Sequence, residues 1–138
     1  MKRLRARAER RVLDARHGLR AAYSDLVGKA YIGGLAGLAG LAKRTPMARR
    51  ALAELSLELD VPYGDHPAQR LDIYRPKRPR PDGASVLYFH GGGFRFLSKE
   101  SHWIFGLRFA RAGYTVYNVE YRLAPQHPYP AAIEDACL

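Results

Sequence analysis

The feature that most constrains the fold is an apolar run that leads directly into three consecutive glycines. Residues 85–89 read SVLYF and residues 90–93 read HGGG. A continuous apolar run of this length is typical of a strand covered on both faces, as in the middle of a parallel sheet. The glycines that follow can adopt positive φ and can turn backbone N–H groups towards an anion. The sequence therefore predicts a buried strand that ends in a loop able to bind negative charge.

The segment after this loop predicts a second strand parallel to the first. A helix is expected over residues 99–112, with Gly113 as its C-cap, and residues 115–121 (TVYNVEY) are expected to form the next strand. Strand, helix and strand at this spacing are typical of a right-handed βαβ unit. Upstream, residues 56–61 and 70–74 predict two antiparallel strands. The pattern as a whole is that of an α/β domain.

Charge divides the chain into two parts. Residues 1–50 carry 13 Lys and Arg against 3 Asp and Glu, whereas residues 51–138 carry 10 of each kind. An excess confined to one end indicates a separate basic segment ahead of a neutral domain. We expect a basic, helical, cap-like segment over residues 1–55 and a domain over residues 56–138.

Residues 2–27 predict a cationic amphipathic helix. Its apolar positions recur every three or four residues, at Leu4, Ala8, Val12, Ala15, Leu19, Tyr23 and Leu26. Two roles are open: the stripe packs against the protein as a cap, or it lies on an anionic membrane with its arginines on the lipid phosphates. Nucleic acid is not an expected partner, because no recognisable nucleic-acid-binding module accompanies the charge.

The uncharged residues 30–42, AYIGGLAGLAGLA, are too short for a membrane span, which needs about 20 residues. A signal-peptide core has this length, but the region before it is long and contains acidic residues. We expect a helical segment, flexible or closely packed, whose glycines let another backbone approach. Thr45 and Pro46 then predict the N-cap and the first position of a short helix that ends at about Leu55.

Taken alone, the loop at residues 90–93 fits an oxyanion site, a plain glycine-rich turn, a phosphate nest or a metal site at His90. A second motif favours the first of these. Residues 121–125 read YRLAP, a proline-rich turn follows, and residues 130–136 read PAAIEDA. HGGGF followed by these motifs resembles the hormone-sensitive-lipase-like carboxylesterases and lipases of the α/β-hydrolase superfamily. The resemblance covers about residues 58–138.

This resemblance implies a fold and a role for each residue of the loop. The fold is expected to be an incomplete α/β-hydrolase fold, a mostly parallel sheet with flanking helices. Gly91 and Gly92 are expected to supply the backbone N–H donors of an oxyanion hole. Gly93 is expected to shape the loop, and His90 to anchor it without being the catalytic histidine.

The resemblance also implies a structural role for the YRLAP segment. Arg122, Glu134 and Asp135 are expected to tie the last helix down by ion pairs. Glu120 stands where the family commonly has aspartate, and Gln126 where it commonly has glutamate. Neither is expected to touch the chemistry.

The catalytic residues of that family are missing from these 138 residues. Its nucleophile lies in Gly-x-Ser-x-Gly, and glycine flanks none of the serines in this way: Ser24, Ser56, Ser85, Ser98 and Ser101. Cys137 has no histidine behind it to act as its base. We therefore expect an esterase fragment that is inactive alone, either truncated or completed by a C-terminal second chain. The alternative is a non-catalytic module that binds a membrane surface through the cationic helix.

Partners and location follow from smaller signals. Phe94, Phe96 and Trp103 around the loop fit a small apolar carboxylic ester as substrate, and they fit positions in the core equally well. The five histidines are dispersed, so neither a metal nor an organic cofactor is expected. A single cysteine fits the cytoplasm, with or without membrane association. The free edge of residues 85–89 predicts marginal stability and self-association.

Overall fold

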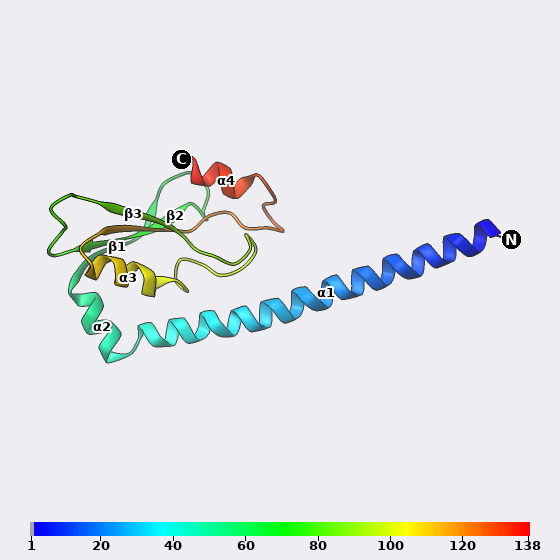
Figure 1. The fold of residues 1–138 in the computed structure, drawn as a ribbon, viewed down its shortest axis with the longest axis horizontal. Coiled ribbons are helices and arrows are strands. Elements are labelled where there is room, and N and C mark those ends of the chain that lie inside the picture. The colour runs from blue at the N-terminus through cyan, green and yellow to red at the C-terminus, as the bar shows by residue number, and fades with distance from the viewer. Residues whose placement is uncertain (1) are drawn as a thin grey trace. The chain divides into compact units, whose positions relative to one another are not determined.

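The computed structural model describes residues 2–138 and contains four helices and four strands within that range (Figure 1). By their internal contacts the residues fall into two units, of which the first ends at Gly33 and the second runs from Gly34 to Leu138. The sheet, the loop at residues 90–93 and both predicted motifs belong to the second unit.

One long helix, α1 (Lys2–Lys43), contains both helical segments expected near the N-terminus. The four glycines within residues 30–42 do not interrupt it, since each costs a helix only about 1 kcal/mol and alanines and leucines surround them. The close backbone approach expected at these glycines is wrong for Gly34, Gly37 and Gly40, because an added Cβ would meet nothing within 4 Å there. Of the expected apolar stripe, Leu19 and Tyr23 are 77% and 70% exposed.

The short helix α2 (Pro46–Ala53) begins as its sequence predicts. The hydroxyl of Thr45 accepts a hydrogen bond from the Ala48 N–H at 3.3 Å, and Pro46 occupies the first turn, where its missing N–H costs nothing. Leu52 on the buried side of α2 joins the core. The Thr45 N-cap is therefore confirmed.

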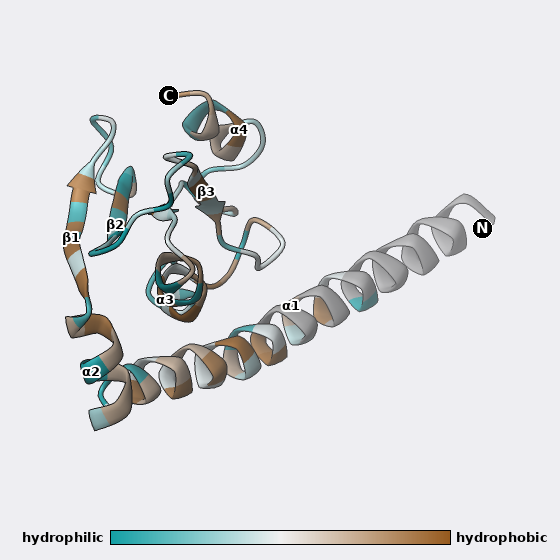
Figure 2. Cartoon of the chain, turned by 60° about the vertical axis from the view of Figure 1, so that its left-hand side comes forward, coloured by the Kyte–Doolittle hydropathy of each residue, from teal (hydrophilic) through white to brown (hydrophobic). Residues whose placement is uncertain are grey.

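A mixed four-stranded sheet forms the centre of the second unit. Its strands are β1 (Leu55–Pro62), β2 (Arg70–Pro76), β3 (Ser85–Phe89) and β4 (Thr115–Val119), in the order β1-β2-β4-β3. The two pairs that involve β2 are antiparallel, and β3 with β4 is parallel. Figure 2 shows the alternation of apolar and polar residues along β1 that lets a strand bury a single face.

The predicted βαβ unit is confirmed by the parallel pairing of β3 with β4. Its helix, α3 (Trp103–Arg111), begins four residues later than expected, because residues 98–102 form turns that are closed by their own side chains. Gly113 ends the unit's helix at φ +96°, where its N–H bonds the Ala110 carbonyl. The last helix is α4 (Ala131–Ala136).

The core lies on the face of the sheet that α3 covers (Figure 1). Tyr74 and Val116 from the strands pack with Trp103, Leu107 and Ala110 from α3. Trp103 also donates its indole N–H to the Ala39 carbonyl at 2.9 Å.

The other face of β3 is open. Leu87 is 59% exposed and Phe89 is 37% exposed. The expectation that this strand is covered on both faces is therefore wrong for this chain, whereas its expected position at an edge of the sheet is confirmed.

Candidate active site

The glycine loop leaves the sheet at the carboxyl end of β3, and two of its glycines have positive φ. Gly92 has φ +126° and Gly93 has φ +62°. An added Cβ at Gly92 would collide with the Phe96 carbonyl oxygen, whereas one at Gly91 would meet nothing within 4 Å. Both the positive φ and the lack of space for a Cβ therefore require glycine at position 92. At Gly91 the loop faces open space.

The loop is closed by hydrogen bonds to the Gly92 carbonyl, and the N–H groups of Gly91 and Gly92 take no part in them. The Gly92 carbonyl accepts the N–H groups of Arg95 and Phe96 at 3.2 and 3.1 Å. Within residues 2–138, no acceptor is recorded for the N–H of Gly91 or Gly92. These two groups are the predicted oxyanion donors, and that role stays a prediction.

A pocket of about 300 Å³ opens beside the loop. Gly91 and Gly93 contribute to its wall. The apolar part of the wall comes from Phe89 at the end of β3, Phe94 after the loop, and Ile133 on α4. The space next to Gly91 is therefore bounded mostly by apolar side chains, and it is open to solvent.

The His90 side chain is buried and contacts the loop at Gly91. Its side chain has no exposed surface, and its ring stacks on Tyr121 with the centroids 4.5 Å apart. Nδ1 lies 2.9 Å from the Gly91 carbonyl oxygen, and Nε2 lies 3.0 Å from Oε1 of Glu120. The Tyr121 hydroxyl donates to the His90 carbonyl at 2.7 Å. These contacts tie His90 to the loop and to Tyr121, and its role as the anchor of an oxyanion loop stays a prediction.

Sequence reasoning missed the role of Glu120. Its two carboxylate oxygens lie at hydrogen-bond distance from the His90 ring and the Lys99 N–H, the latter at 2.9 Å. The Tyr63 hydroxyl donates to its carbonyl at 2.6 Å. The sequence contained a signal for this contact. Phe89 pairs with Val119 in a parallel ladder, so the residues that follow them, His90 and Glu120, lie side by side. Glu120 therefore contacts the residue that follows β3, and the expectation that it does not touch the chemistry stays a prediction.

The ion pairs expected of the YRLAP segment are confirmed. Arg122 Nη2 lies 3.0 Å from Glu134 Oε2 and 2.7 Å from Asp135 Oδ1. The Gln69 amide also donates to Asp135 at 2.7 Å. Burial raises the pKa of the Asp135 carboxyl, but the hydrogen bonds from Arg122 outweigh it and the net pKa lies below the ordinary value. These contacts fix α4 beside the pocket.

One serine and one histidine meet near the loop, but they do not form a nucleophile and its base. Ser101 Oγ lies 3.0 Å from His102 Nδ1, yet the hydroxyl donates its proton to the Ser98 carbonyl at 2.7 Å. His102 Nδ1 faces the same carbonyl at 3.3 Å. A base would have to accept the serine proton, and this proton is already bound elsewhere.

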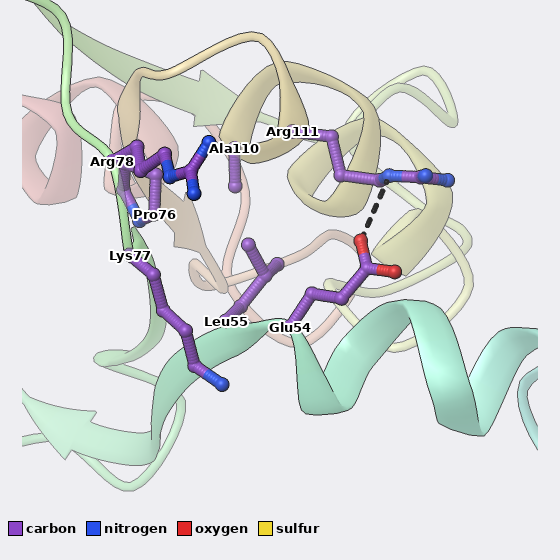
Figure 3. Close-up of a pocket in the computed structure, with 7 residues that line it drawn as sticks. All are labelled: Glu54, Leu55, Pro76, Lys77, Arg78, Ala110 and Arg111. Carbon is purple, nitrogen blue, oxygen red and sulfur yellow. Dashed lines mark ion pairs between the residues drawn. The ribbon is translucent and has the colours of Figure 1, made fainter.

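A second pocket, of about 460 Å³, lies at the opposite end of the sheet (Figure 3). It is formed where β1 begins and β2 ends, and Glu54 and Arg111 pair across it at 3.3 Å. Lys77 points to the Ala53 carbonyl, 3.1 Å away. This pocket contains no part of either motif, so the pocket beside residues 90–93 is the candidate site.

No cluster of three or more His, Cys, Asp or Glu side chains among the residues that the structure describes could hold a metal ion. Among the same residues, no helix is both long and apolar enough to cross a membrane.

The fold and the loop define an α/β hydrolase. Residues 86–138 match the family model described as alpha/beta hydrolase fold. The second unit therefore has an α/β-hydrolase fold, and its matches lie in the hormone-sensitive-lipase-like carboxylesterase group.

Relatives and solved structures agree with this assignment. The chain is 38% identical over 77 residues to kynurenine formamidase of Danio rerio, which covers 56% of the chain and 26% of that protein. It is 42% identical over 87 residues to esterase LipI of Mycobacterium tuberculosis, covering 62% of the chain and 27% of the esterase. A hormone-sensitive lipase from a metagenome library superposes with a TM-score of 0.56 at 28% identity, over 78% of this chain and 32% of the lipase. The chain thus spans about a quarter of the length of the curated relatives it matches.

Proposed function

We propose that this chain supplies the oxyanion-binding part of a carboxylic ester hydrolase. The observation that carries the proposal is the pair of N–H groups at Gly91 and Gly92. They have no recorded acceptor among residues 2–138, and the loop that carries them borders an apolar pocket. The same loop follows β3, at the carboxyl end of a parallel strand pair, where α/β proteins bind their ligands.

The chemistry assigned to these groups is charge stabilisation. A nucleophile forms a bond to the carbonyl carbon of the ester, and the electron pair of the C=O double bond moves onto oxygen. The N–H groups of Gly91 and Gly92 donate to this oxyanion, a contribution of about 3 kcal/mol for each donor. When the tetrahedral intermediate collapses, the electron pair re-forms the C=O bond and the C–O bond to the alcohol breaks. The leaving oxygen takes the proton that the base removed from the nucleophile, and no charge remains at the loop.

The nucleophile, its base and the orienting acid are not supplied by these 138 residues. No serine has the Gly-x-Ser-x-Gly context, and the proton of Ser101 is bound to a carbonyl. Loss of such a nucleophile costs about 10⁶ in turnover. The purified chain is therefore expected to hydrolyse p-nitrophenyl butyrate no faster than a matched Gly92→Ala variant, and activity that the variant abolishes would contradict this.

The apolar pocket wall favours a substrate with an apolar acyl or alcohol group. Phe89, Phe94 and Ile133 are 37%, 56% and 49% exposed, so they are open to a ligand. A small aliphatic ester would bury these side chains at about 25 cal/mol for each Å² of apolar surface removed from water. Such an ester, and a second chain that supplies the catalytic residues, are the partners proposed.

A carboxylate tests the donors on the chain as it stands, because its charged oxygen stands in for the oxyanion. Butyrate is titrated into the ¹⁵N-labelled chain while the amide resonances are followed. Gly91 and Gly92 are expected to shift together and saturably, and Gly92→Ala is expected to remove the effect through its collision with Phe96. Gly83→Ala is the matched control, since Gly83 also has positive φ but lies in an open surface turn. Shifts spread over the surface, without these two amides, would refute the proposal.

A further inference from the structure

Phe94, the residue after the glycine loop, has a backbone conformation that ordinarily belongs to glycine. Its φ is +59°, and it directly follows Gly93 at +62°. In this left-handed region the Cβ of an L residue crowds its own backbone, and a bulky side chain is rare there. Burial of the ring does not offset this strain, because Phe94 is 56% exposed. Strained residues of this kind cluster at ligand sites, and Phe94 lines the pocket beside the loop.

The segment that carries the second motif, residues 121–125, holds Phe94 in this conformation. The Phe94 carbonyl accepts the Ala124 N–H at 2.9 Å. The Tyr121 ring meets the Phe94 ring edge-on, with the centroids 6.3 Å apart. Tyr121 is itself part of the pocket wall, whereas Ala124 lies outside the wall and acts on it by fixing the backbone of Phe94.

A second apolar side chain of the wall is fixed by the same segment. Arg122 pairs with Asp135 at 2.7 Å, and Asp135 lies on α4 two residues after Ile133. Ile133 is 49% exposed and lines the pocket together with Phe94. Both residues therefore have a fixed backbone and apolar surface that a ligand can still cover, so binding orders little of the protein.

We infer that Phe94 determines which apolar group the pocket prefers, and that its strained backbone holds the ring in the pocket wall. The inference rests on the proposed function, since the group belongs to the ester whose oxygen is bound at Gly91 and Gly92. A longer alkyl chain covers more of the ring, so the gain in affinity with chain length depends on Phe94. A residue with a purely structural role would change the binding of all chain lengths alike.

Carboxylates of increasing length test this role on the full ¹⁵N-labelled chain. Acetate, butyrate and hexanoate are titrated while the Gly91 and Gly92 amides are followed, and affinity is expected to rise with length. Phe94→Ala is expected to weaken hexanoate about tenfold and acetate by less than about twofold, because only the longer chain covers the ring. Phe94→Leu is expected to restore most of the gain.

The matched control is Phe109→Ala, since Phe109 is a 36% exposed phenylalanine on α3 outside the pocket wall. It is expected to leave the whole series unchanged. Equal weakening of all three carboxylates by Phe94→Ala would overturn the inference.

The strain is measured by comparing Phe94→Gly with Phe94→Ala, because both remove the ring and only glycine adopts this φ freely. The Gly variant is expected to have an unfolding equilibrium constant about fivefold smaller than the Ala variant in urea denaturation. An Ala variant at least as stable as the Gly variant would show that the backbone is not strained. If Phe94→Ala does not fold, Phe94→Gly takes its place in the binding series.

The alcohol 1-hexanol separates this inference from the proposed function, because it has the alkyl chain without a charged oxygen. The resonances of Phe94 and Ile133 are expected to respond to it, and Phe94→Ala is expected to weaken the response. This result without any response of the Gly91 and Gly92 amides to the carboxylates refutes the proposed function and leaves the preference of Phe94 standing. A response of these amides that does not depend on Phe94 refutes the inference alone, and no response to either ligand refutes both.

Discussion

Lys99 shows how a single buried charge is stabilised in this domain. It is 3% exposed, and its ammonium lies within 2.7–2.8 Å of carboxylate oxygens of Asp60, Asp72 and Glu100. Burial opposes the charged form, but the hydrogen bonds that the ammonium donates to these carboxylates outweigh it and raise the pKa of Lys99. Asp72 is 1% exposed and also accepts the Asp60 N–H at 3.0 Å, so it depends on this cation.

Removal of the Lys99 charge is expected to destabilise the chain strongly. Lys99→Met leaves the buried Asp72 carboxylate without its cation, which costs about 3–5 kcal/mol in the free energy of unfolding. Arg75→Met is the control, because the Arg75–Glu58 pair is about half exposed and water screens its attraction. Urea denaturation of the three proteins gives the values. A Lys99→Met loss no larger than that of Arg75→Met would contradict this account.

Residues of the site could be predicted from the sequence only in part, for a physical reason. The conformation at residues 90–93 follows from glycine itself, so the loop was predictable. The Lys99 cluster joins residues from three separate parts of the chain and depends on Asp60, which has φ +55° at an irregularity of β1. No local pattern contains that information.

At the level of elements, α4 is attached to the sheet through Asp135. Its carboxyl has a lowered pKa, so its contribution is fully present above the ordinary value near 4 and is lost as the pH falls through the folded value. We expect the free energy of unfolding to fall steeply below about pH 4. In Asp135→Asn the fall in the free energy of unfolding at low pH is expected to be smaller. Near neutral pH the variant is expected to be less stable by about 3 kcal/mol.

Glu134→Gln provides the comparison for Asp135, since both carboxylates pair with Arg122 but Glu134 is 58% exposed. It is expected to change the free energy of unfolding by less than about 1 kcal/mol. The fall in stability at low pH is expected to stay the same as in the wild type. Denaturation at a series of pH values measures both. Equal effects of the two variants would show that burial of Asp135 does not matter.

The two edges of the sheet differ in how they resist pairing with another strand. On β1, Glu58 and Asp60 carry charge, and the register shifts between Glu58 and Val61, both of which protect an edge. The residues of β3 are uncharged, and Leu87 is 59% exposed. Hydropathy alone predicted that β3 is apolar, but which of its faces is covered depended on helices from elsewhere in the chain.

Self-association through β3 is therefore expected of the isolated chain. Leu87→Lys places a charge on the exposed face of this edge and is expected to shift the chain towards monomer without loss of stability. Leu59→Lys, at a 52% exposed position of β1, is expected to change nothing. Sedimentation at several concentrations measures both. A chain that is monomeric throughout, or equal effects of the two variants, would contradict this role of β3.

For the whole molecule, the sequence predicted the order of the elements and the position of the loop better than it predicted how the N-terminal helix behaves. The motifs predict the order of the elements and the position of the loop, since residues 90–93 and 121–125 are held together by one parallel strand pair. The apolar positions of α1 fit a protein surface and a lipid surface equally well. Periodicity therefore gave the helix but not its partner.

A chimera with esterase LipI measures most directly whether this chain belongs to an ester-hydrolysing site. Residues 58–138 replace the matching part of that esterase, which supplies the rest of the enzyme. The chimera is expected to hydrolyse p-nitrophenyl butyrate, with Gly92→Ala lowering kcat/KM about 100- to 1000-fold and Gly83→Ala leaving it within about twofold. A folded chimera that is inactive, or one whose activity survives Gly92→Ala, would contradict the assignment of the Gly91 and Gly92 amides to the oxyanion.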